Sequence, residues 1–393
     1  MKRVLSLSTL YPNSANPRFG AFVARSLEAL AARGDWDVTV INPIGTPPLA
    51  LGKYAALKHA AVDGMEGRVR VLRPTFPLIP KFGGRFNPAL IAHSVGSLAA
   101  KLHAERPFDL LDAQFFYPDG PAVARLARSL ALPFSIKARG ADIHYWGSKP
   151  WGLRQMRDAA SDATGLLAVC GALAEDMAAL GLPRDKIALH YTGLDRNRFR
   201  PLDHPMLRRR LGEQLGIALS DKAPLLATVG ALIPRKGQEF VIRALAVLPG
   251  AQLLLVGKGE DEARLRQMAR DMGLERQVHF LGSLDHDLLP LVLSAADAMV
   301  LPSASEGLAN AWVEALACGT PLVITDAGGA RELVTSPDAG MIVERNSDAI
   351  AAAIRTLLDN PIPRERVVAT AARFSWEANA AALAEYYERL LQG

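Results

Sequence analysis

The chain has 393 residues, half of them hydrophobic, so length and composition predict a globular protein of two or three domains and exclude a disordered chain. Charge is distributed unevenly: residues 1–200 hold 26 Lys and Arg against 16 Asp and Glu, whereas the remaining residues hold 19 against 24. The basic first half predicts an anionic partner. No recognition motif or basic repeat supports nucleic acid in that role, so we expect no nucleic-acid partner.

The two cysteines, Cys170 and Cys318, lie far apart in the sequence and outside any metal-ligand spacing. This usage favours reduced core thiols in a cytoplasmic protein. The start, Lys2 and Arg3 followed by VLSLSTL, is similar to a signal peptide, but the apolar run is too short and no cleavage site follows. We therefore expect a buried strand there. No run approaches the ~18 apolar residues of a membrane span, and a peripheral position at the inner face of a membrane stays open.

Strand-like and helix-like runs alternate from the start of the chain, which is typical of parallel sheets covered by helices on both faces. In the first half the expected strands are VLSLS, VTVIN, VRVL, DLLDA, FSIKA, GLLAV and KIALH. The helices expected between them include residues 20–33, 88–105, 118–130 and 171–180. This half is predicted to form a doubly wound α/β domain.

A second series of strands begins at Leu225, after a polar stretch at residues 192–205 that is rich in proline and arginine. Its expected strands are LLATVG, QLLLVG, QVHFLG, DAMVLP, PLVIT and GMIV. A linker at 192–205 would separate two sheets, and ligands bind at the carboxyl ends of the strands in such sheets. The ending from Phe374, FSWEANAAALAEYYERLL, predicts an amphipathic helix.

The sequence is organised around residues 299–332, where an apolar run, a polar turn, a helix and a second apolar run follow one another. Glu306 and Glu314 bracket the expected helix start, and eight steps of about 1.5 Å place them roughly 12 Å apart. A helix start binds diphosphate through its free amides, and an acid on either side then suits a neutral hydroxyl on a flanking group. The structural alternative is a solvated acid before an ordinary helix.

Two adjacent cations, Arg235 and Lys236, follow the strand LLATVG in the loop ALIPRKG. Just beyond a strand end, an arginine fork and a lysine point charge can reach two phosphates, and the alternative is a pair of solvated surface cations. The Gly-rich stretch at residues 253–260, LLLVGKGE, lacks the third glycine and the downstream acid of a dinucleotide fingerprint. We interpret it as a tight turn.

The stretch at 299–332 resembles the signature of the retaining glycosyltransferases of family 4 (group 1), in which two glutamates are separated by seven residues and EA.A.G.P continues the pattern. ALIPRKG, preceded by Gly230, resembles the family's G.L...KG element. The resemblance implies a GT-B type fold: two Rossmann-like doubly wound domains that face a cleft, with a C-terminal helix crossing back to the first domain. The implied parts are an acceptor domain at 1–198, a donor domain at 199–374 and the helix at 375–393. The residues that continue the signature are Glu314, Ala315, Ala317, Gly319 and Pro321.

The resemblance further implies a hexosyltransferase that moves a sugar, with retention, from a nucleoside-diphosphate sugar to a hydroxyl acceptor. Glu306 would bind sugar hydroxyls at the catalytic centre, and Arg235 and Lys236 would stabilise charge on the leaving diphosphate. No residue stands out as a nucleophile, so the resemblance implies front-face attack, in which the leaving phosphate accepts the acceptor proton. Glu314 would bind the ribose. The other implied donor-binding residues are Gly20, Gly230, Leu281, Gly307, Leu308, Ala309 and Asn310.

Two of these positions carry further expectations. Ala309 stands where many family members have proline, which relaxes the turn but leaves the amides available. Leu281 lies in FLGSL, which matches the stretch that holds the base in the family.

Two stretches have the DxD letters of a metal site. Asp35-Trp36-Asp37 precedes a strand, as a turn does, and Asp285-His286-Asp287 opens a helix, as a cap does. Since Arg235 and Lys236 can supply positive charge in place of a metal, we expect metal-independent transfer and no cofactor.

The acceptor side is expected in the first half. KARGADIHYW, residues 137–146, resembles the family's HGxD stretch: Gly140 and Asp142 match, whereas Arg139 stands where histidine is common. Arg139 is expected to bind a phosphate or an acidic acceptor, and whether it replaces the histidine in function is open. The neighbouring His144 is either structural or catalytic.

The first loop, YPNSANPRFG, offers two more candidates. Gly20 either lets the backbone approach the donor diphosphate or only starts a helix. Arg18 is a candidate for contact with phosphate or acceptor.

Residues 68–86 interleave basic residues with Phe76, Phe82 and Phe86. The stretch predicts peripheral contact with an anionic membrane or a site for a lipid-linked sugar acceptor, and the alternative is a solvated, partly packed loop. The expected context is surface polysaccharide or glycolipid biosynthesis. A nucleotide-sugar epimerase and a non-catalytic nucleotide-sugar-binding protein are the alternative functions, and product analysis separates them.

Overall fold

The computed structural model describes residues 1–47, 52–79, 83–202, 206–285 and 287–392. The chain forms two compact units: one comprises Met1–Gly193 and the C-terminal segment from Trp376, and the other is Leu194–Ser375. The boundary at 193/194 falls before the expected 198/199, because Arg196 already bonds within the second unit, to the carbonyl oxygens of Ala371 (2.6 Å) and Phe374 (2.9 Å).

The first unit is built on an eight-stranded sheet of order β10-β9-β8-β7-β1-β2-β5-β4, in which only β4 runs antiparallel to its neighbour. Its inner strands are buried on both faces, as parallel strands between two layers of helices must be. The strands are β1 (Lys2–Leu7), β2 (Trp36–Ile41), β4 (Gly64–Glu66), β5 (Val69–Leu72), β7 (Leu110–Ala113), β8 (Phe134–Ala138), β9 (Gly165–Ala168) and β10 (Ile187–Leu189), and β3 (Ile44–Thr46) pairs with β6 (Thr75–Pro77) in a small separate sheet.

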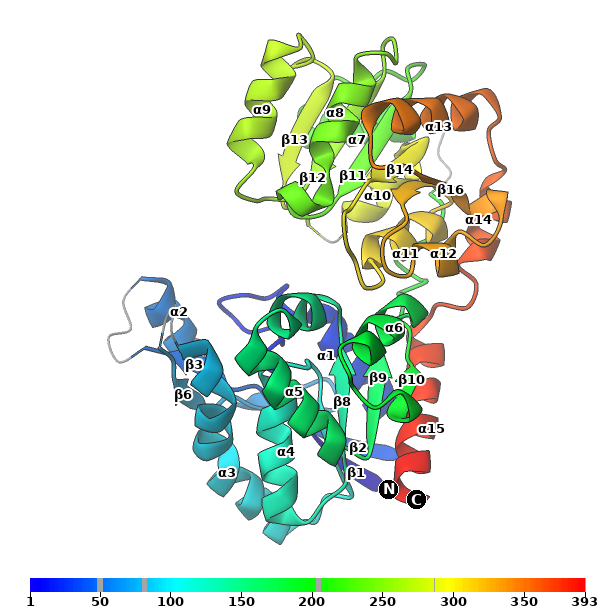
Figure 1. Ribbon diagram of the computed structural model, residues 1–393. Coiled ribbons are helices and arrows are strands. Elements are labelled where there is room, and N and C mark those ends of the chain that lie inside the picture. The colour runs from blue at the N-terminus through cyan, green and yellow to red at the C-terminus, as the bar shows by residue number, and fades with distance from the viewer. Residues whose placement is uncertain (48–51, 80–82, 203–205, 286, 393) are drawn as a thin grey trace. The chain divides into compact units, whose positions relative to one another are not determined.

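Helices join these strands and cover the sheet (Figure 1). They are α1 (Ala21–Ala32), α2 (Lys53–His59), α3 (Asn87–Glu105), α4 (Asp119–Leu130), α5 (Pro150–Asp162) and α6 (Gly171–Ala179). The seven strands expected from apolar runs are all present. The short strands β3, β4 and β6 were not expected, because three residues carry too little alternation to stand out.

The C-terminal helix α15 (Trp376–Gln392) completes the core of the first unit, as Figure 1 shows. Leu383 and Tyr387 are fully buried beside α1, and the Tyr387 ring meets the Trp36 ring of β2 edge-on at 5.3 Å. Ser26 of α1 donates a 2.6 Å hydrogen bond to the Asn379 side chain. The expected crossing of the last helix back to the first domain is confirmed.

The second unit holds a six-stranded, fully parallel sheet of order β13-β12-β11-β14-β15-β16. Its strands are β11 (Leu225–Val229), β12 (Gln252–Val256), β13 (Val278–Gly282), β14 (Ala298–Leu301), β15 (Leu322–Thr325) and β16 (Gly340–Val343). Its helices are α7 (Leu207–Leu215), α8 (Gln238–Leu245), α9 (Glu262–Asp271), α10 (Leu289–Ala295), α11 (Asn310–Ala317), α12 (Ala330–Leu333), α13 (Ser347–Asp359) and α14 (Arg364–Thr370).

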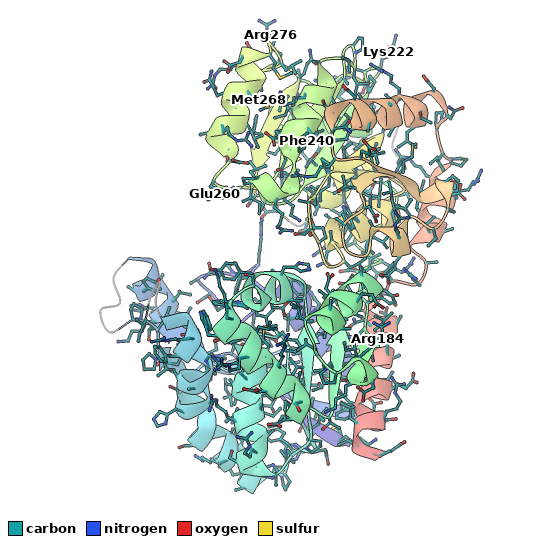
Figure 2. The ribbon with its side chains drawn as sticks, in the orientation of Figure 1. Arg184, Lys222, Phe240, Glu260, Met268 and Arg276 are labelled. Atoms are coloured by element: carbon teal, nitrogen blue, oxygen red, sulfur yellow. The ribbon has the colours of Figure 1, made fainter. Side chains whose placement is uncertain are left out.

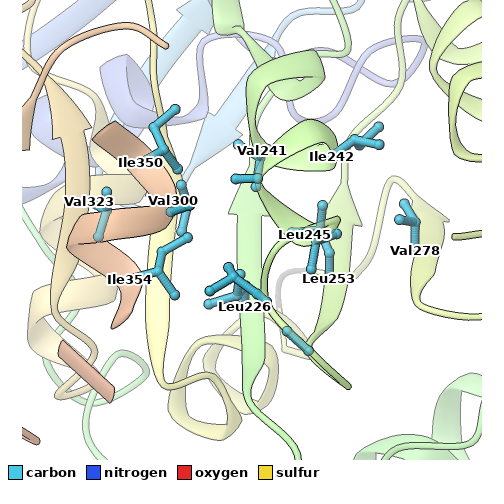
Figure 3. Close-up of a cluster of buried hydrophobic side chains, with 14 of the residues drawn as sticks. Leu226, Val241, Ile242, Leu245, Leu253, Val278, Val300, Val323, Ile350 and Ile354 are labelled. Carbon is cyan, nitrogen blue, oxygen red and sulfur yellow. The ribbon is translucent and has the colours of Figure 1, made fainter. Parts of the chain in front are cut away.

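One face of this second sheet packs against α8, α9 and α13 through aliphatic side chains (Figure 3). Leu226 and Val300 of the central strands are fully buried there, against Val241 of α8 and Ile350 of α13. Because the helices cover the sheet faces, the loops at the carboxyl ends of the strands are left to bind ligands. Among the described residues no helix combines the length and apolar character needed to cross a membrane.

Candidate functional site

The loops that follow β11, β12 and β14 meet at the carboxyl edge of the second sheet. The amide of Leu232, after β11, donates to the carbonyl of Lys258, after β12, at 3.1 Å. The amide of Ala304, after β14, donates to the carbonyl of Arg235 at 2.8 Å. A Cβ on Gly257 would lie within 3.0 Å of the Gly230 carbonyl oxygen, so the backbones approach too closely for any other residue. This close packing is what the tight-turn interpretation of 253–260 requires.

The two cations and the first acid of the candidate site pair directly. Lys236 forms a short ion pair with Oε1 of Glu306, and Arg235 Nη1 lies 3.6 Å from Oε2. The Lys236 and Glu306 side chains are only 12% and 8% exposed, whereas Arg235 keeps 41% of its side-chain surface and also donates to the Ser305 carbonyl. The resemblance to the family assigned these residues to separate ligand groups, and the structure brings them into one cluster.

Arg345 holds this cluster from a distant part of the chain. Its Nε donates to the Pro302 carbonyl at 2.9 Å, and its Nη2 donates to the Pro234 carbonyl at 2.8 Å. Its guanidinium also lies 4.8 Å from the centre of the Phe240 ring, which Figure 2 labels on α8. Sequence reasoning missed Arg345, because nothing in its surroundings distinguishes it from an ordinary surface arginine.

The turn after β15 supports the backbone of the glutamate loop. Thr325 donates its hydroxyl to the Ser303 carbonyl, and the Gly329 amide donates to the Gly307 carbonyl at 2.8 Å. Gly328 has φ 52°, and a Cβ there would come within 3.0 Å of the Glu306 and Gly307 carbonyl oxygens. The TDAGG letters therefore position Glu306 and Gly307.

Backbone N–H groups at the start of helix α11 donate to no described residue. Its N-cap, Ala309, has no capping side chain, and no described residue accepts from the amides of Leu308, Ala309 or Asn310. Ala309 has φ −68°, which is the angle that proline imposes, so the replacement of proline leaves this turn unchanged. The helix start can bind an anion through free N–H groups and the positive end of the helix dipole.

Glu314 lies in the middle of α11 and is partly buried. No described residue forms a hydrogen bond or ion pair with its carboxylate, and burial raises its pKa from 4.5 to about 7. One acid, neutralised by two cations, thus precedes the helix start in sequence, and a second acid, with no counter-charge among the described residues, lies within the helix. Leu281, the candidate for base contact, lies half-buried one residue before the end of β13.

The candidates of the first unit show mostly structural contacts. Asp142 is fully buried and accepts from the amides of Phe116 (2.7 Å), Arg139 (2.9 Å) and Ile143 (3.1 Å), although burial raises its pKa. Its match to HGxD therefore fixes the turn at Gly140, where φ is 109°. With both oxygens engaged, Asp142 is held as a loop-supporting acid.

Arg139 is held against two neighbours. It donates to the Gln114 side chain at 2.6 Å and to the Gln114 carbonyl at 3.1 Å, and its guanidinium lies 5.0 Å from the centre of the Phe22 ring. Burial lowers its pKa to about 10, so it stays charged at neutral pH. His144 is exposed and contacts Asp176 at 2.9 Å.

The first loop has a local reason for its glycine. Gly20 has φ 71°, and a Cβ there would come within 3.0 Å of the Leu10 carbonyl. The Gly20 carbonyl accepts from the amide of Val23 at 2.8 Å at the start of α1. The left-handed φ and the close approach to the Leu10 backbone explain the glycine, and Arg18 near it is exposed.

Three acids of the DxD stretches have arginine partners. Asp35 pairs with Arg33 at 2.8 Å and Asp37 with Arg3 at 2.9 Å, while Asp287 pairs with Arg198 at 3.0 Å. His286 lies outside the described residues. The cysteines are both buried, and neither is in a disulfide, as expected for core thiols.

Two family models match separate parts of this chain. The family described as "Glycosyl transferases group 1" matches residues 214–374, and a glycosyl transferase 4-like domain matches residues 19–193. The glycogen synthase of Mycobacterium tuberculosis is 30% identical over 98% of this chain and 94% of its own length. The chain belongs to the group 1 glycosyltransferases.

Two further relatives align with this chain over different shares of their length. The GDP-mannose-dependent monoacylated alpha-(1-6)-phosphatidylinositol monomannoside mannosyltransferase of Corynebacterium glutamicum is 36% identical, over 47% of this chain and 52% of that protein. The match thus spans about half of that relative's length. The putative teichuronic acid biosynthesis glycosyltransferase TuaC of Bacillus subtilis is 26% identical over 98% of both chains.

The fold of this group 1 glycosyltransferase also has solved counterparts. The sucrose-phosphate synthase of Thermosynechococcus elongatus superposes with a TM-score of 0.80 at 21% identity, over the whole of both chains. The GT-B type fold implied by the sequence is confirmed, and the family match does not support the epimerase alternative, which was expected on the same fold.

Proposed function

We propose that this group 1 glycosyltransferase moves a sugar, with retention of anomeric configuration, from a nucleoside-diphosphate sugar to a hydroxyl acceptor. One observation carries the proposal: the uncapped start of α11 lies between Glu306, which two cations hold, and Glu314, which has no partner among the described residues. An anion site between two acids suits a diphosphate with a neutral sugar on one side and a ribose on the other.

In this proposal the second unit supplies binding and charge stabilisation. The amides of Leu308 to Asn310 and the cations Arg235 and Lys236 bind the diphosphate and stabilise the charge that develops on it as the bond to the anomeric carbon breaks. Glu306 then accepts hydrogen bonds from sugar hydroxyls. The acceptor hydroxyl attacks the face that the diphosphate leaves, and a phosphate oxygen takes its proton. No step requires a metal.

The acceptor is proposed to be a glycan or a glycolipid, because the relatives named above are enzymes of glycolipid, teichuronic acid and glycogen synthesis. The C. glutamicum relative is GDP-mannose-dependent, which makes GDP-mannose the first donor to test.

Peripheral contact with an anionic membrane is part of the proposal. Ile79, Phe86 and Tyr145 of the first unit are 48%, 45% and 58% exposed, and the cations Arg85 and Lys149 lie over the Phe86 and Tyr145 rings. Exposed aromatic rings beside cations suit a lipid head-group layer. Phe82, the other aromatic residue of this stretch, lies outside the described residues. Co-sedimentation with vesicles containing phosphatidylglycerol tests the contact, and vesicles of phosphatidylcholine are the control.

A donor screen with product analysis tests the function. We expect one of GDP-, UDP- or ADP-sugars to raise the melting temperature, since a ligand that binds only the folded state must do so, and to yield a new α-linked glycoside with a suitable acceptor. An epimerised donor sugar would support the epimerase, and binding without turnover would support a sensor. Unchanged transfer by both Glu306→Gln and Lys236→Ala would contradict the assigned site.

A further inference from the structure

A pocket of about 420 Å³ lies in the first unit, between the loop that follows β1 and the β4–β5 hairpin. Pro12 follows β1, and Arg73 follows β5, so both lie at the carboxyl edge of the parallel strands. β4 runs antiparallel to β5, which brings Asp63, the residue before β4, to the same edge. This is the edge at which open α/β sheets bind ligands.

Arg73 links the segments that line the pocket. Its amide donates to Asp63 Oδ1 at 2.6 Å, its Nη1 to the Val62 carbonyl at 2.9 Å and its Nη2 to the Pro12 carbonyl at 3.0 Å, and it also pairs with Glu66. The Arg73 side chain is only 7% exposed, and its buried Nε donates to no described residue. The arginine thus joins the walls of the pocket, and its charge is already neutralised by Glu66.

The remaining polar groups suit hydroxyls. Asp63 and Glu66 each keep one carboxylate oxygen that accepts from no described residue. Asn13 uses its side-chain oxygen to accept from the amides of Ala15 and Asn16, which leaves its NH2 group to donate. Two acceptors and one donor, at a site of this size, match the hydroxyl groups of one or two rings of a sugar or cyclitol.

The charge of the pocket rejects anions. Asp63 and Glu66 outnumber Arg73, so the lining carries a net charge of about −1 at neutral pH, in contrast to the basic first half as a whole. An anionic ligand would meet the charge of Asp63, which forms no ion pair with a described residue, and like charges repel at contact distance. Val62 and Met65, each 64% exposed, add an apolar surface for the C–H face of a ring.

We propose that this pocket binds the neutral, polyhydroxylated unit of the acceptor, a sugar or cyclitol ring without a phosphate or carboxylate on it. The assignment as acceptor rests on the proposed function, whereas the binding of a neutral ring does not. The pocket therefore selects the acceptor by charge as well as by shape.

The test is ligand binding to the full chain without any donor. Saturation-transfer NMR with methyl α-D-mannopyranoside and myo-inositol is compared with mannose 6-phosphate. Met65→Trp fills the open side of the pocket without touching the core, and Val247→Trp, a surface residue of the second unit that is 48% exposed, is the matched control. Asp63→Asn keeps the acceptor for the Arg73 amide and removes one negative charge.

We expect at least one neutral ligand to bind, at least tenfold more tightly than mannose 6-phosphate, and its signal to fall at least fivefold in Met65→Trp but not in Val247→Trp. Asp63→Asn is expected to reduce the difference in affinity between the neutral ligand and mannose 6-phosphate. Absence of neutral binding, equal binding by Met65→Trp, or tighter binding of mannose 6-phosphate would overturn the proposal. Because no donor is present, these results stand apart from the transfer assay: transfer without pocket binding contradicts only the pocket, and pocket binding without transfer contradicts only the proposed function.

Discussion

Replacing Glu314 by glutamine is expected to stabilise the second unit and to weaken donor binding at the same time. The carboxylate has no partner among the described residues, and burial raises its pKa from 4.5 to about 7. Each pKa unit corresponds to about 1.4 kcal/mol, so the rise from 4.5 to about 7 makes the ionised carboxylate cost at most about 3.5 kcal/mol above pH 7. Partial access to water lowers that value, and we expect about 2–3 kcal/mol.

The sign of the pH dependence follows from the order of deprotonation. The unfolded chain releases the Glu314 proton near pH 4.5, and the folded chain near pH 7, so the wild-type unit loses stability as pH rises through this window and stays level above it. Glu314→Gln does not titrate. Its advantage is therefore full at pH 8 and falls below about 1 kcal/mol at pH 5.

Differential scanning calorimetry at pH 8 and pH 5 measures this difference. For a unit of this size, about 2–3 kcal/mol raises the melting temperature by roughly 5–10 °C, and Glu275→Gln, an exposed acid of the same unit, is the control that should shift neither transition. If Glu314→Gln melts at or below the wild-type temperature at pH 8, the carboxylate is not destabilised by burial and the reasoning fails.

Three further predictions concern the same site. Lys236→Ala should lower the stability of the second unit by about 3 kcal/mol, because it leaves the Glu306 carboxylate buried without its closest cation. The double variant Lys236→Ala and Glu306→Ala should recover most of that stability in thermal denaturation, but it should not recover sugar transfer. Arg235→Ala should weaken binding of the accepted nucleoside diphosphate roughly tenfold in calorimetric titration, whereas Arg276→Ala, exposed and at the opposite edge of the sheet before β13, should not. Affinity for the nucleotide sugar should rise with pH up to about 7 and level off above it, because a ribose hydroxyl donates to the ionised Glu314. Calorimetric titration at pH 6 and pH 8 should show this rise in the wild type. A rise that persists in Glu314→Gln would refute the assignment of Glu314 to the ribose.

The fold was largely predictable because the strands that matter are buried on both faces. Runs such as VLSLS and QLLLV are nearly all apolar, and each forms a strand where expected. The hairpin strand β4 was missed because Gly64–Glu66 is short and mostly exposed. That omission also hid the pocket beside Met65, which exists only because the hairpin turns Asp63 toward the end of β5.

The residues of the site could be predicted from the sequence, but the contacts between them could not. The spacing of Glu306 and Glu314 marked a helix start, and the free amides of that start are present. Spacing could not show that Lys236, 70 residues before Glu306, neutralises it, or that Arg345 holds both loops. The HGxD match placed Asp142 near ligands, whereas its oxygens are engaged by backbone amides. A residue that contacts a ligand and a residue that supports a loop can match the same sequence motif, so the match alone does not distinguish the two roles.

The position of α15 has a consequence for how the protein is made. The first unit buries Trp36 and Val38 beneath Leu383 and Tyr387, which are synthesised after the whole of the second unit. The second unit, Leu194–Ser375, is complete in sequence before that helix exists. During synthesis the second unit can therefore fold before the first unit is complete, and the earlier residues keep an apolar face uncovered until α15 has been synthesised. A chain that lacks α15 would expose that face, so chaperones should retain it far longer than a chain that contains the helix.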